Sequence, residues 1–158
     1  MLIETITADL TDPLHAAAVL ALIDEYAQEP VVGQARPLDA TVRDRLIPRL
    51  AAHPTTHIIL ARQGSRFVGI AVCFFGFSTF NAAPLLNVHD LAVTRDCRGN
   101  GVGAKLLLAV ESAARQAGCC KVTLEVNDNN PARKLYERCG FVLGVVGQDA
   151  QRFMTKRL

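Results

Sequence analysis

One strand–loop–helix segment, residues 88–104, constrains the fold of this chain more than any other. An apolar run leads into a loop in which Gly99, Gly101 and Gly103 alternate with other residues, and an amphipathic stretch follows. Glycine lets the backbone approach a ligand closely and turn successive N–H groups to one side. Because the N-terminus of the following helix carries partial positive charge, this junction predicts a site for an anion, phosphate above all.

The glycine spacing separates this loop from two common phosphate loops. A dinucleotide fingerprint requires G-x-G-x-x-G, and a nucleotide P-loop requires G-x-x-x-x-G-K-[ST]. This chain has G-x-G-x-G followed by Ala104, Lys105 and Leu106, so neither motif fits. Residues 98–103 instead satisfy [QR]-x-x-G-x-[GA]. Taken alone, the loop also fits a glycine-rich turn without a ligand, since short glycine motifs occur often by chance.

A second motif lies at residues 129–141, which read N-x-x-A-x-x-x-Y-x-x-x-G-F with Tyr136 as the tyrosine. Together the two motifs resemble those of the GNAT superfamily of acyl-CoA N-acyltransferases, in the family's order and at a typical separation. The resemblance covers residues 86–141. It implies an α/β fold with a central mixed sheet flanked by helices, and transfer of an acetyl group from acetyl-CoA to a primary amine of a small molecule or peptide.

Composition fits a single domain over residues 1–158. The length of 158 residues suffices for one core and not for two. Of these residues 50% are hydrophobic and 20% are charged, the balance of an ordinary globular domain. A formal net charge of +2 without a basic block predicts no nucleic-acid partner. The sequence shows neither a signal peptide nor an apolar run of membrane-spanning length, so we expect a cytoplasmic protein without a membrane partner. The sequence also allows a homodimer.

The five cysteines predict neither disulfides nor a metal site. Their number is odd and their spacing is not that of metal ligands. Adjacent Cys119 and Cys120 are expected as buried small hydrophobic side chains. A reducing cytoplasm is the simplest compartment for such a set.

Hydrophobic periodicity predicts a mixed chain without repeats. Asp12 and Pro13 mark the start of the first helix, and Pro48 is expected to end or kink the second. Helices are expected at 14–28, from Asp39 onward, at 103–117 and at 131–138. Strands are expected at 2–7, 56–61, 67–77, 86–93 and 121–126, with a final pair at 141–146 and 152–156.

The resemblance assigns the cofactor contacts. In the GNAT family the pantetheine lies along the strand that here ends at Val93, whose N–H would stabilise the thioester oxyanion. Loop N–H groups would hold the pyrophosphate with help from the Arg98 side chain. Asn129 would bind cofactor polar groups or cap the following helix. The expected cofactor-binding residues are Leu91, Ala92, Val93, Arg98, Gly99, Asn100, Gly101, Val102, Gly103, Ala104 and Asn129.

Tyr136 is the expected acid that protonates the departing thiolate, and packing of its helix on the sheet is the structural alternative. For the base we rank His89 first, because arylalkylamine-acetylating relatives carry a histidine there and imidazole suits proton transfer near neutrality. Glu125 ranks second; it resembles a strand glutamate of ribosomal-protein N-terminal acetylating relatives, although its spacing to the tyrosine motif is one residue shorter. A water chain without a dedicated base ranks third.

Strand alternation orders the residues around the expected base. His89 should share a face with Asn87 and Leu91, and Asp90 should face the other way unless a bulge intervenes. Asn87 stands where histone-type relatives carry a glutamate, and an asparagine cannot be a base.

The acceptor amine is not specified by the sequence. Asp24, Glu25 and Glu29 fit either attraction of a cationic amine or a solvated helix end. Four phenylalanines fit either an apolar acceptor pocket or, for most of them, the core; they are Phe74, Phe75, Phe77 and Phe80. A non-catalytic acyl-CoA-binding sensor or interaction domain is the alternative to an enzyme, because fold alone does not separate the two.

Overall fold

Five strands form the central sheet in the order β1-β2-β3-β4-β5. The computed structural model describes residues 2–30 and 35–143, and further along residues 145–146, 149–150, 154 and 156. Neighbours from β1 to β4 pair antiparallel, whereas β5 runs parallel to β4, so the sheet is mixed as predicted. The strands are β1 (Ile3–Thr7), β2 (Thr56–Gln63), β3 (Arg66–Ser78), β4 (Ala83–Val93) and β5 (Val122–Leu124).

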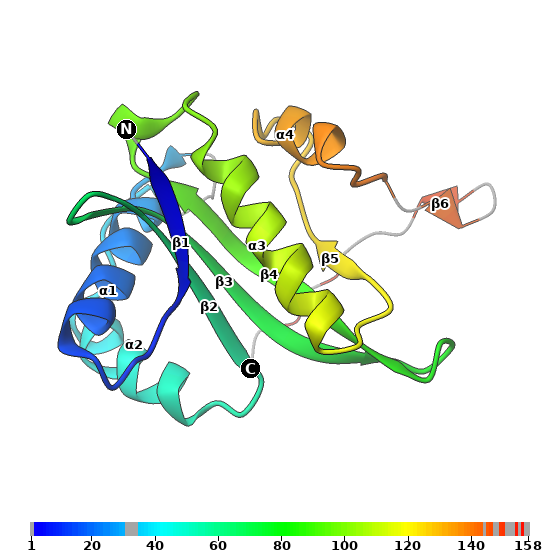
Figure 1. Cartoon of the computed structure of the whole chain (residues 1–158), viewed down its shortest axis with the longest axis horizontal. Coiled ribbons are helices and arrows are strands. Elements are labelled where there is room, and N and C mark those ends of the chain that lie inside the picture. The colour runs from blue at the N-terminus through cyan, green and yellow to red at the C-terminus, as the bar shows by residue number, and fades with distance from the viewer. Residues whose placement is uncertain are drawn as a thin grey trace.

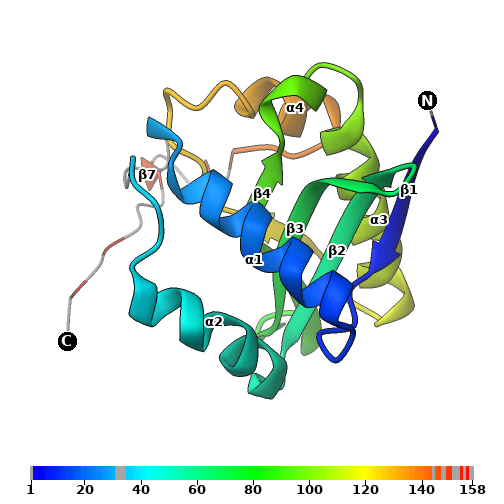
Figure 2. The ribbon, with the colours of Figure 1, turned by 90° about the vertical axis from the view of Figure 1, so that its left-hand side faces the viewer.

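Helices cover both faces of this sheet (Figures 1 and 2). α1 (Pro13–Ala27) and α2 (Ala40–Ala52) lie on one face, and α3 (Val102–Gln116) lies on the other. A 3-10 turn, η2 (Arg95–Cys97), connects β4 toward α3. The short α4 (Arg133–Arg138) lies beside the start of α3, where a Cβ on Gly103 would come within 2.8 Å of Leu135 Cδ2.

Each face of the sheet has its own hydrophobic cluster. On the α3 face, Leu86 and Val88 of β4 pack with Leu106 and Val110 of α3. On the other face, residues of α1 and α2 pack against β2, β3 and the end of β4; they include Val19, Leu22, Leu50, Leu60, Ile70, Val72 and Ala92. The close packing of α3 against the sheet holds the glycine loop at the end of β4.

Gly69 of β3 allows this close packing. A Cβ there would lie 3.0 Å from Val102 Cγ1 and 3.1 Å from the Ala92 carbonyl oxygen. Those distances are too short for an ordinary contact, so a larger residue would push the start of α3 away from the end of β4.

The element order agrees with the prediction, and the differences are at element ends. Asp12 caps α1 by accepting a hydrogen bond from the Leu14 N–H at 2.8 Å. Of the two outcomes expected at Pro48, an end of the helix or a kink, the end is wrong: α2 continues to Ala52, and Leu50 beyond the proline is buried against the α1 face. Proline removes one donor but leaves the rest of the helical ladder.

The C-terminal pair also differs from the prediction. β6 (Val145–Val146) pairs with β7 (Asp149–Ala150) in a separate two-stranded sheet, and residues 141–143 are not in a strand. Most of the strand expected at 152–156 lies outside the described residues. Met154 and Lys156 are described and are not in a strand.

Two further expectations concern the cysteines and the membrane. All five cysteines are free thiols; Cys119 is half-buried, but Cys120 is exposed, contrary to expectation. Cys120 follows the turn at Gly118 (φ 70°), and its N–H donates to the Pro84 carbonyl, which places it at the surface. Within the described ranges, none of the helices has the length and apolar character needed to cross a bilayer.

Candidate active site

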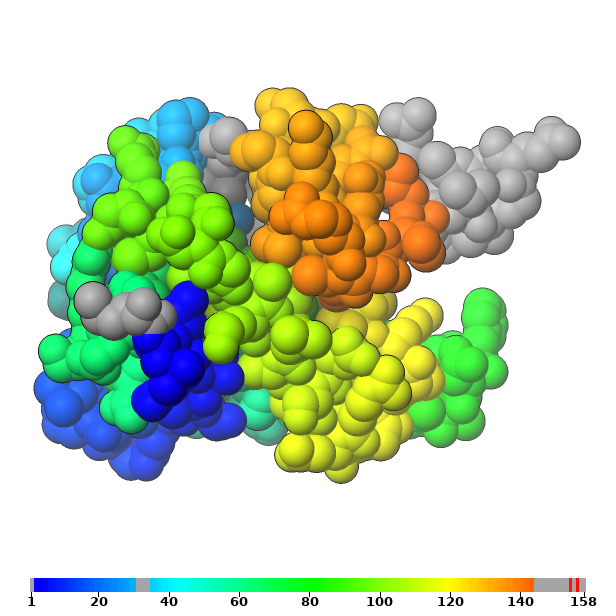
Figure 3. All heavy atoms as spheres, turned by 45° about the horizontal axis from the view of Figure 1, so that its top comes forward, coloured from blue at the N-terminus to red at the C-terminus, as the bar shows by residue number. Residues whose placement is uncertain are grey.

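The loop before α3 presents a row of free main-chain N–H groups. Gly99 and Gly101 have φ of 78° and 80°, a left-handed conformation that strains other residues. The Gly101 carbonyl accepts the first helical hydrogen bond, from the Lys105 N–H at 3.1 Å. Within the described part of the chain, nothing accepts a hydrogen bond from the N–H groups of residues 99–104. With the helix dipole behind them, these donors can bind an anion. Figure 3 shows the loop and α4 side by side on one face.

The Arg98 side chain is engaged with the protein itself. Its Nε donates to the Val93 carbonyl oxygen at 2.9 Å, and its Nη2 donates to Glu29 Oε1 at 2.9 Å. Arg95 also reaches Glu29 Oε1, at 3.2 Å. The Arg98 hydrogen bond holds the pKa of Glu29 below its ordinary value, and Arg95 adds to this effect. Arg98 therefore ties the end of α1 to the end of β4.

The outer edge of β4 is open where the expected pantetheine residues lie. β5 pairs with β4 only over Leu86–Val88, and no described strand pairs with this edge beyond Val88. The Thr94 N–H donates to Val68 of β3 at 2.9 Å. Because backbone direction alternates along a strand, the N–H and C=O of Val93 are directed away from β3. An extended ligand can add to this edge like a further strand.

A β-bulge places His89 and Asp90 on the same face of the sheet. Val88 pairs with Cys73 and Asp90 with Val72, so His89 is the extra residue of β4. Val72 belongs to the cluster under α1 and α2, which puts Asp90 on that face. The bulge supplies the exception to alternation, because an extra residue reverses the faces that follow it.

The same bulge separates His89 from Leu91. The His89 ring lies 5.6 Å from the ring of Phe74, which packs against the α1 face. Leu91 packs with the α3 cluster instead. The expectation that His89 shares its face with Leu91 is therefore wrong, whereas Asn87, paired with Phe74, does lie on the His89 face.

Asp90 is half-buried, and its charge interacts with Tyr26 of α1 and with Cys73 of β3. Burial raises the pKa of Asp90, and the neighbouring His89 lowers it by less. Burial raises the pKa of Tyr26 to about 12, with contributions from Asp90 and Tyr136. No described residue donates a hydrogen bond to the Asp90 carboxylate. The sequence alone left the face of Asp90 dependent on a bulge, and the pairing with β3 reveals that bulge.

Tyr136 of α4, the residue predicted as the acid, is buried beside Phe141. Its side chain is 8% exposed and its ring meets Phe141 edge-on, with centroids 6.0 Å apart. Burial raises the pKa of Tyr136, which keeps the phenol protonated near neutrality. The hydroxyl makes no hydrogen bond with a described residue.

The other two polar candidates lie at the surface. Glu125 is exposed, and its carboxylate oxygens lie 3.4 Å from Asn87 Nδ2, which also donates to Thr123 Oγ1 at 3.1 Å. Asn129 is exposed and is not the helix cap: Asn130 Oδ1 accepts from the Ala132 N–H at 2.9 Å. The amide of Asn129 stays free toward described residues.

Two of the acidic residues proposed to attract an amine have arginine partners. Asp24 Oδ2 lies 2.7 Å from Arg43 Nη1, and Asp24 Oδ1 accepts from the Leu38 N–H. Glu29 holds Arg95 and Arg98, as described above. These two carboxylates are therefore neutralised within the protein.

The four phenylalanines divide into two pairs. Phe74 and Phe75 are half-buried and pack against the two clusters. Phe77 and Phe80, near the β3–β4 turn, are 63% and 103% exposed. They therefore lie outside the core, where most of the four phenylalanines were expected.

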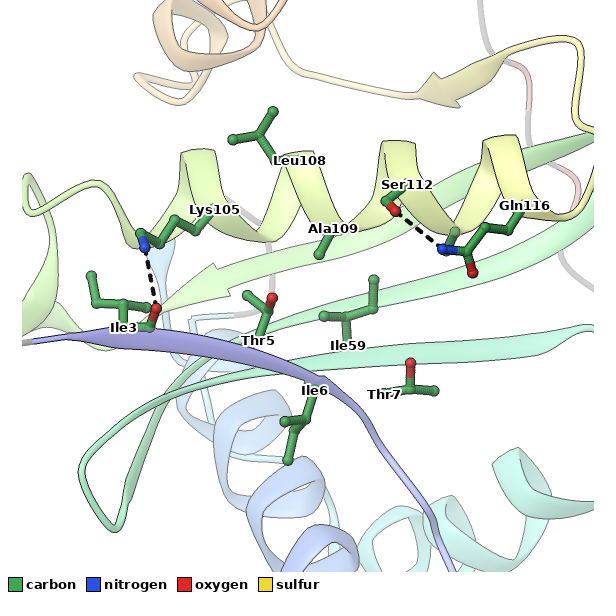
Figure 4. A pocket seen from close by; sticks show the side chains of 11 residues that line it. Ile3, Thr5, Ile6, Thr7, Ile59, Lys105, Leu108, Ala109, Ser112 and Gln116 are labelled. Atoms are coloured by element: carbon green, nitrogen blue, oxygen red, sulfur yellow. Dashed lines mark hydrogen bonds between the residues drawn. The ribbon is translucent and has the colours of Figure 1, made fainter.

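A groove of about 440 Å³ lies between β1 and α3 (Figure 4). Lys105 Nζ donates to the Ile3 carbonyl at 3.2 Å, and Gln116 donates to Ser112 Oγ at 3.3 Å along this groove. None of the predicted site residues lines it. Of the predicted site residues, His89, Leu91, Ala92 and Val93 lie instead on β4, whose outer edge is open beyond Val88. Among the described side chains no cluster of His, Cys, Asp or Glu is suited to a metal ion.

The family model described as Acetyltransferase (GNAT) family matches residues 19–141. The chain belongs to this family. This GNAT chain is 33% identical over 79 residues to a thialysine N-epsilon-acetyltransferase of Bos taurus, covering 49% of the chain and 46% of the relative. It is 30% identical over 89 residues to an aminoalkylphosphonate N-acetyltransferase of Salmonella typhimurium, covering 56% and 58%. The matches thus span about half of each curated relative.

Solved structures share the fold over nearly the whole chain. A ribosomal-protein-alanine N-acetyltransferase from Brucella melitensis superposes with a TM-score of 0.72 at 19% identity, covering 98% of this chain and 100% of that one. A putative acetyltransferase from Agrobacterium tumefaciens gives 0.72 at 24% identity, covering 94% and 99%. The fold predicted from the two motifs is therefore confirmed.

Proposed function

We propose that this GNAT chain is an acetyl-CoA-dependent N-acetyltransferase that acts on a primary amine of a small molecule or peptide. The observation that carries the proposal is the row of free N–H groups at residues 99–104, which adjoins the open edge of β4. The row suits a pyrophosphate, and the edge suits an extended amide-containing arm. Coenzyme A contains both.

The described residues divide the chemistry between them. The loop N–H groups would bind the pyrophosphate, and the free Asn129 amide would bind polar groups of the arm. The Val93 N–H, directed away from β3, would stabilise the thioester oxyanion. Tyr136 would protonate the departing thiolate, because burial keeps its phenol in the acid form.

The amine must lose a proton before it attacks the thioester carbonyl in a ternary complex. His89 is our first candidate base, because it is exposed on the α1 face at the point where β4 and β5 part. Glu125, beside Asn87 on the same face, is the second, and a water chain is the third.

The named relatives support an amine as acceptor. Their names specify thialysine, aminoalkylphosphonate and, for a rice relative, glucosamine 6-phosphate, and each of these carries an amino group. We place the enzyme in the cytoplasm, a compartment that its five free thiols fit.

A panel of primary amines with acetyl-CoA tests the proposal, with free thiol as the readout. We expect thiol release that depends on the amine and falls in Tyr136→Phe. The alternative, a non-catalytic acyl-CoA sensor, predicts acetyl-CoA binding without thiol release for any amine. A protein that does not bind acetyl-CoA would contradict both.

A further inference from the structure

We propose that Asp90 is a further catalytic residue, whose carboxylate binds the ammonium group of the acceptor and takes a proton from it, while His89 passes that proton to solvent. The inference rests on the proposed acetyl transfer. It also specifies the acceptor as an amine that is cationic when it arrives.

The bulge in β4 creates this pair. In a regular strand the two side chains would point to opposite faces. Here Asp90 pairs with Val72 on the α1 face, and the ring of His89 lies against Phe74 on the same face. The bulge comes directly after Val88, the last residue of β4 that pairs with β5. The carboxylate therefore lies where the two strands begin to diverge, on the open part of β4 that ends at Val93.

The charges around the site favour Asp90 over the other acids on this side. Asp24 is paired with Arg43, and Glu29 with Arg95 and Arg98. Glu125 is exposed and faces the Asn87 amide. In the described residues Asp90 has no arginine or lysine partner, and the basic side chain that interacts with its charge is His89. A half-buried carboxylate without a cation attracts one from a ligand.

Two titratable groups of other elements interact with the Asp90 charge. They are Tyr26 of α1 and Cys73 of β3, whose side chain packs on the α3 face of the sheet. Burial raises the pKa of both to about 12, so both stay neutral near physiological pH. The negative charge of Asp90 contributes to the rise at Tyr26 and Cys73. Burial also raises the pKa of Asp90, which makes its carboxylate a stronger base than one in water.

The proton balance of the step is complete. The acceptor arrives as R–NH3+ and gives one proton to the Asp90 carboxylate, from which it passes through His89 to solvent. The neutral amine then forms the N–C bond to the thioester carbonyl carbon, and the C–S bond breaks. The leaving sulfur takes the Tyr136 proton, and the phenol regains a proton from the nitrogen through water. One hydrogen remains on the amide.

The test compares Asp90→Asn with wild type and with two controls. Asp90→Asn keeps the shape and removes the charge; Asp90→Glu keeps the charge. Asp96→Asn removes an exposed carboxylate that is paired with Arg66 in the turn after β4. The readouts are kcat/KM for the best amine of the panel as a function of pH, and the affinity for acetyl-CoA by calorimetry.

We expect Asp90→Asn to lower kcat/KM for the amine about a hundredfold, to lose the acidic limb of the pH profile and to bind acetyl-CoA as wild type does. Asp90→Glu should keep part of the wild-type rate, and the control Asp96→Asn should keep all of it. If Asp90→Asn fails to fold, the pH dependence of kcat/KM in Asp90→Glu replaces it as the test. The longer glutamate side chain should shift the acidic limb of that profile.

A wild-type profile and rate in Asp90→Asn, or in Asp90→Glu where the asparagine variant does not fold, would overturn the inference and leave the acetyltransferase proposal standing. A wild-type protein that acetylates no amine would overturn both.

Discussion

The proposed site has a half for the cofactor and a half for the acceptor, and these use different parts of the chain. The cofactor half, from Val93 to α3, consists of main-chain N–H groups that two left-handed glycines and a helix start direct outward. The acceptor half consists of side chains, His89, Asp90 and Glu125, that a bulge and a diverging strand bring to one face. The first depends on local sequence, whereas the second depends on strand pairing.

This difference has a functional consequence. A backbone site recognises a group that stays the same, such as a pyrophosphate, and tolerates changes in most side chains. A side-chain site on a bulge can change its specificity through single substitutions. We therefore expect substitutions in the two halves to separate cofactor binding from turnover.

Replacing Tyr136 should give the largest loss of turnover. Tyr136→Phe removes only the hydroxyl and keeps the packing on Phe141, so kcat should fall about tenfold to a thousandfold while acetyl-CoA binding persists. Steady-state kinetics and calorimetry measure the two effects. Tyr26→Phe is the matched change on α1 and should cost less. Unchanged turnover, with chemistry rate-limiting, would make Tyr136 a structural residue.

Removing the Asp90 charge should change how stability depends on pH. Because burial raises the pKa of Asp90 above its ordinary 3.8, the folded protein disfavours the ionised form. The contribution of Asp90 to the free energy of unfolding should therefore fall as the pH rises from about 4 through the folded-state value. Asp90→Asn should lack this contribution and should be more stable than wild type near neutrality. Urea unfolding at several pH values measures this, and parallel curves would contradict it.

Glu29→Gln should have the smallest effect. This substitution weakens the ion pair between Glu29 and Arg98, whose Nε donates to the Val93 carbonyl oxygen. The KM for acetyl-CoA should therefore rise by less than about fivefold, with little change in kcat. Glu4→Gln breaks a comparable pair with Arg62, in which Glu4 Oε2 lies 2.8 Å from Arg62 Nη2 on β2, and serves as the control. An equal rise in both variants would show that Glu29 has no specific role.

Local features of the sequence predicted much of the fold. Asp12 caps α1, and the element order is as predicted. Each of these features depends on residues a few positions apart. The motif spacing also predicted the family, which the match over residues 19–141 confirms.

Non-local geometry explains what the sequence could not predict. The faces of Asp90 and Leu91 depend on the register with β3, and the partners of Arg98 come from the end of α1. The cap expected at Asn129 is not present: the N-cap of α4 is Ala132, and the neighbouring Asn130 accepts a hydrogen bond from the Ala132 N–H in the turn before the helix. The roles assigned to His89, Glu125 and Asn129 remain predictions.

The central claim is that the backbone of the glycine loop binds acetyl-CoA, and calorimetric titration of Gly101→Val tests it most directly. Gly64→Val is the matched control, because Gly64 also has a positive φ (61°) and open surroundings but lies in the β2–β3 turn. We predict that wild type and Gly64→Val bind acetyl-CoA alike, and that folded Gly101→Val binds at least about tenfold more weakly, a loss of about 1.4 kcal/mol. Wild-type affinity in folded Gly101→Val would contradict the account.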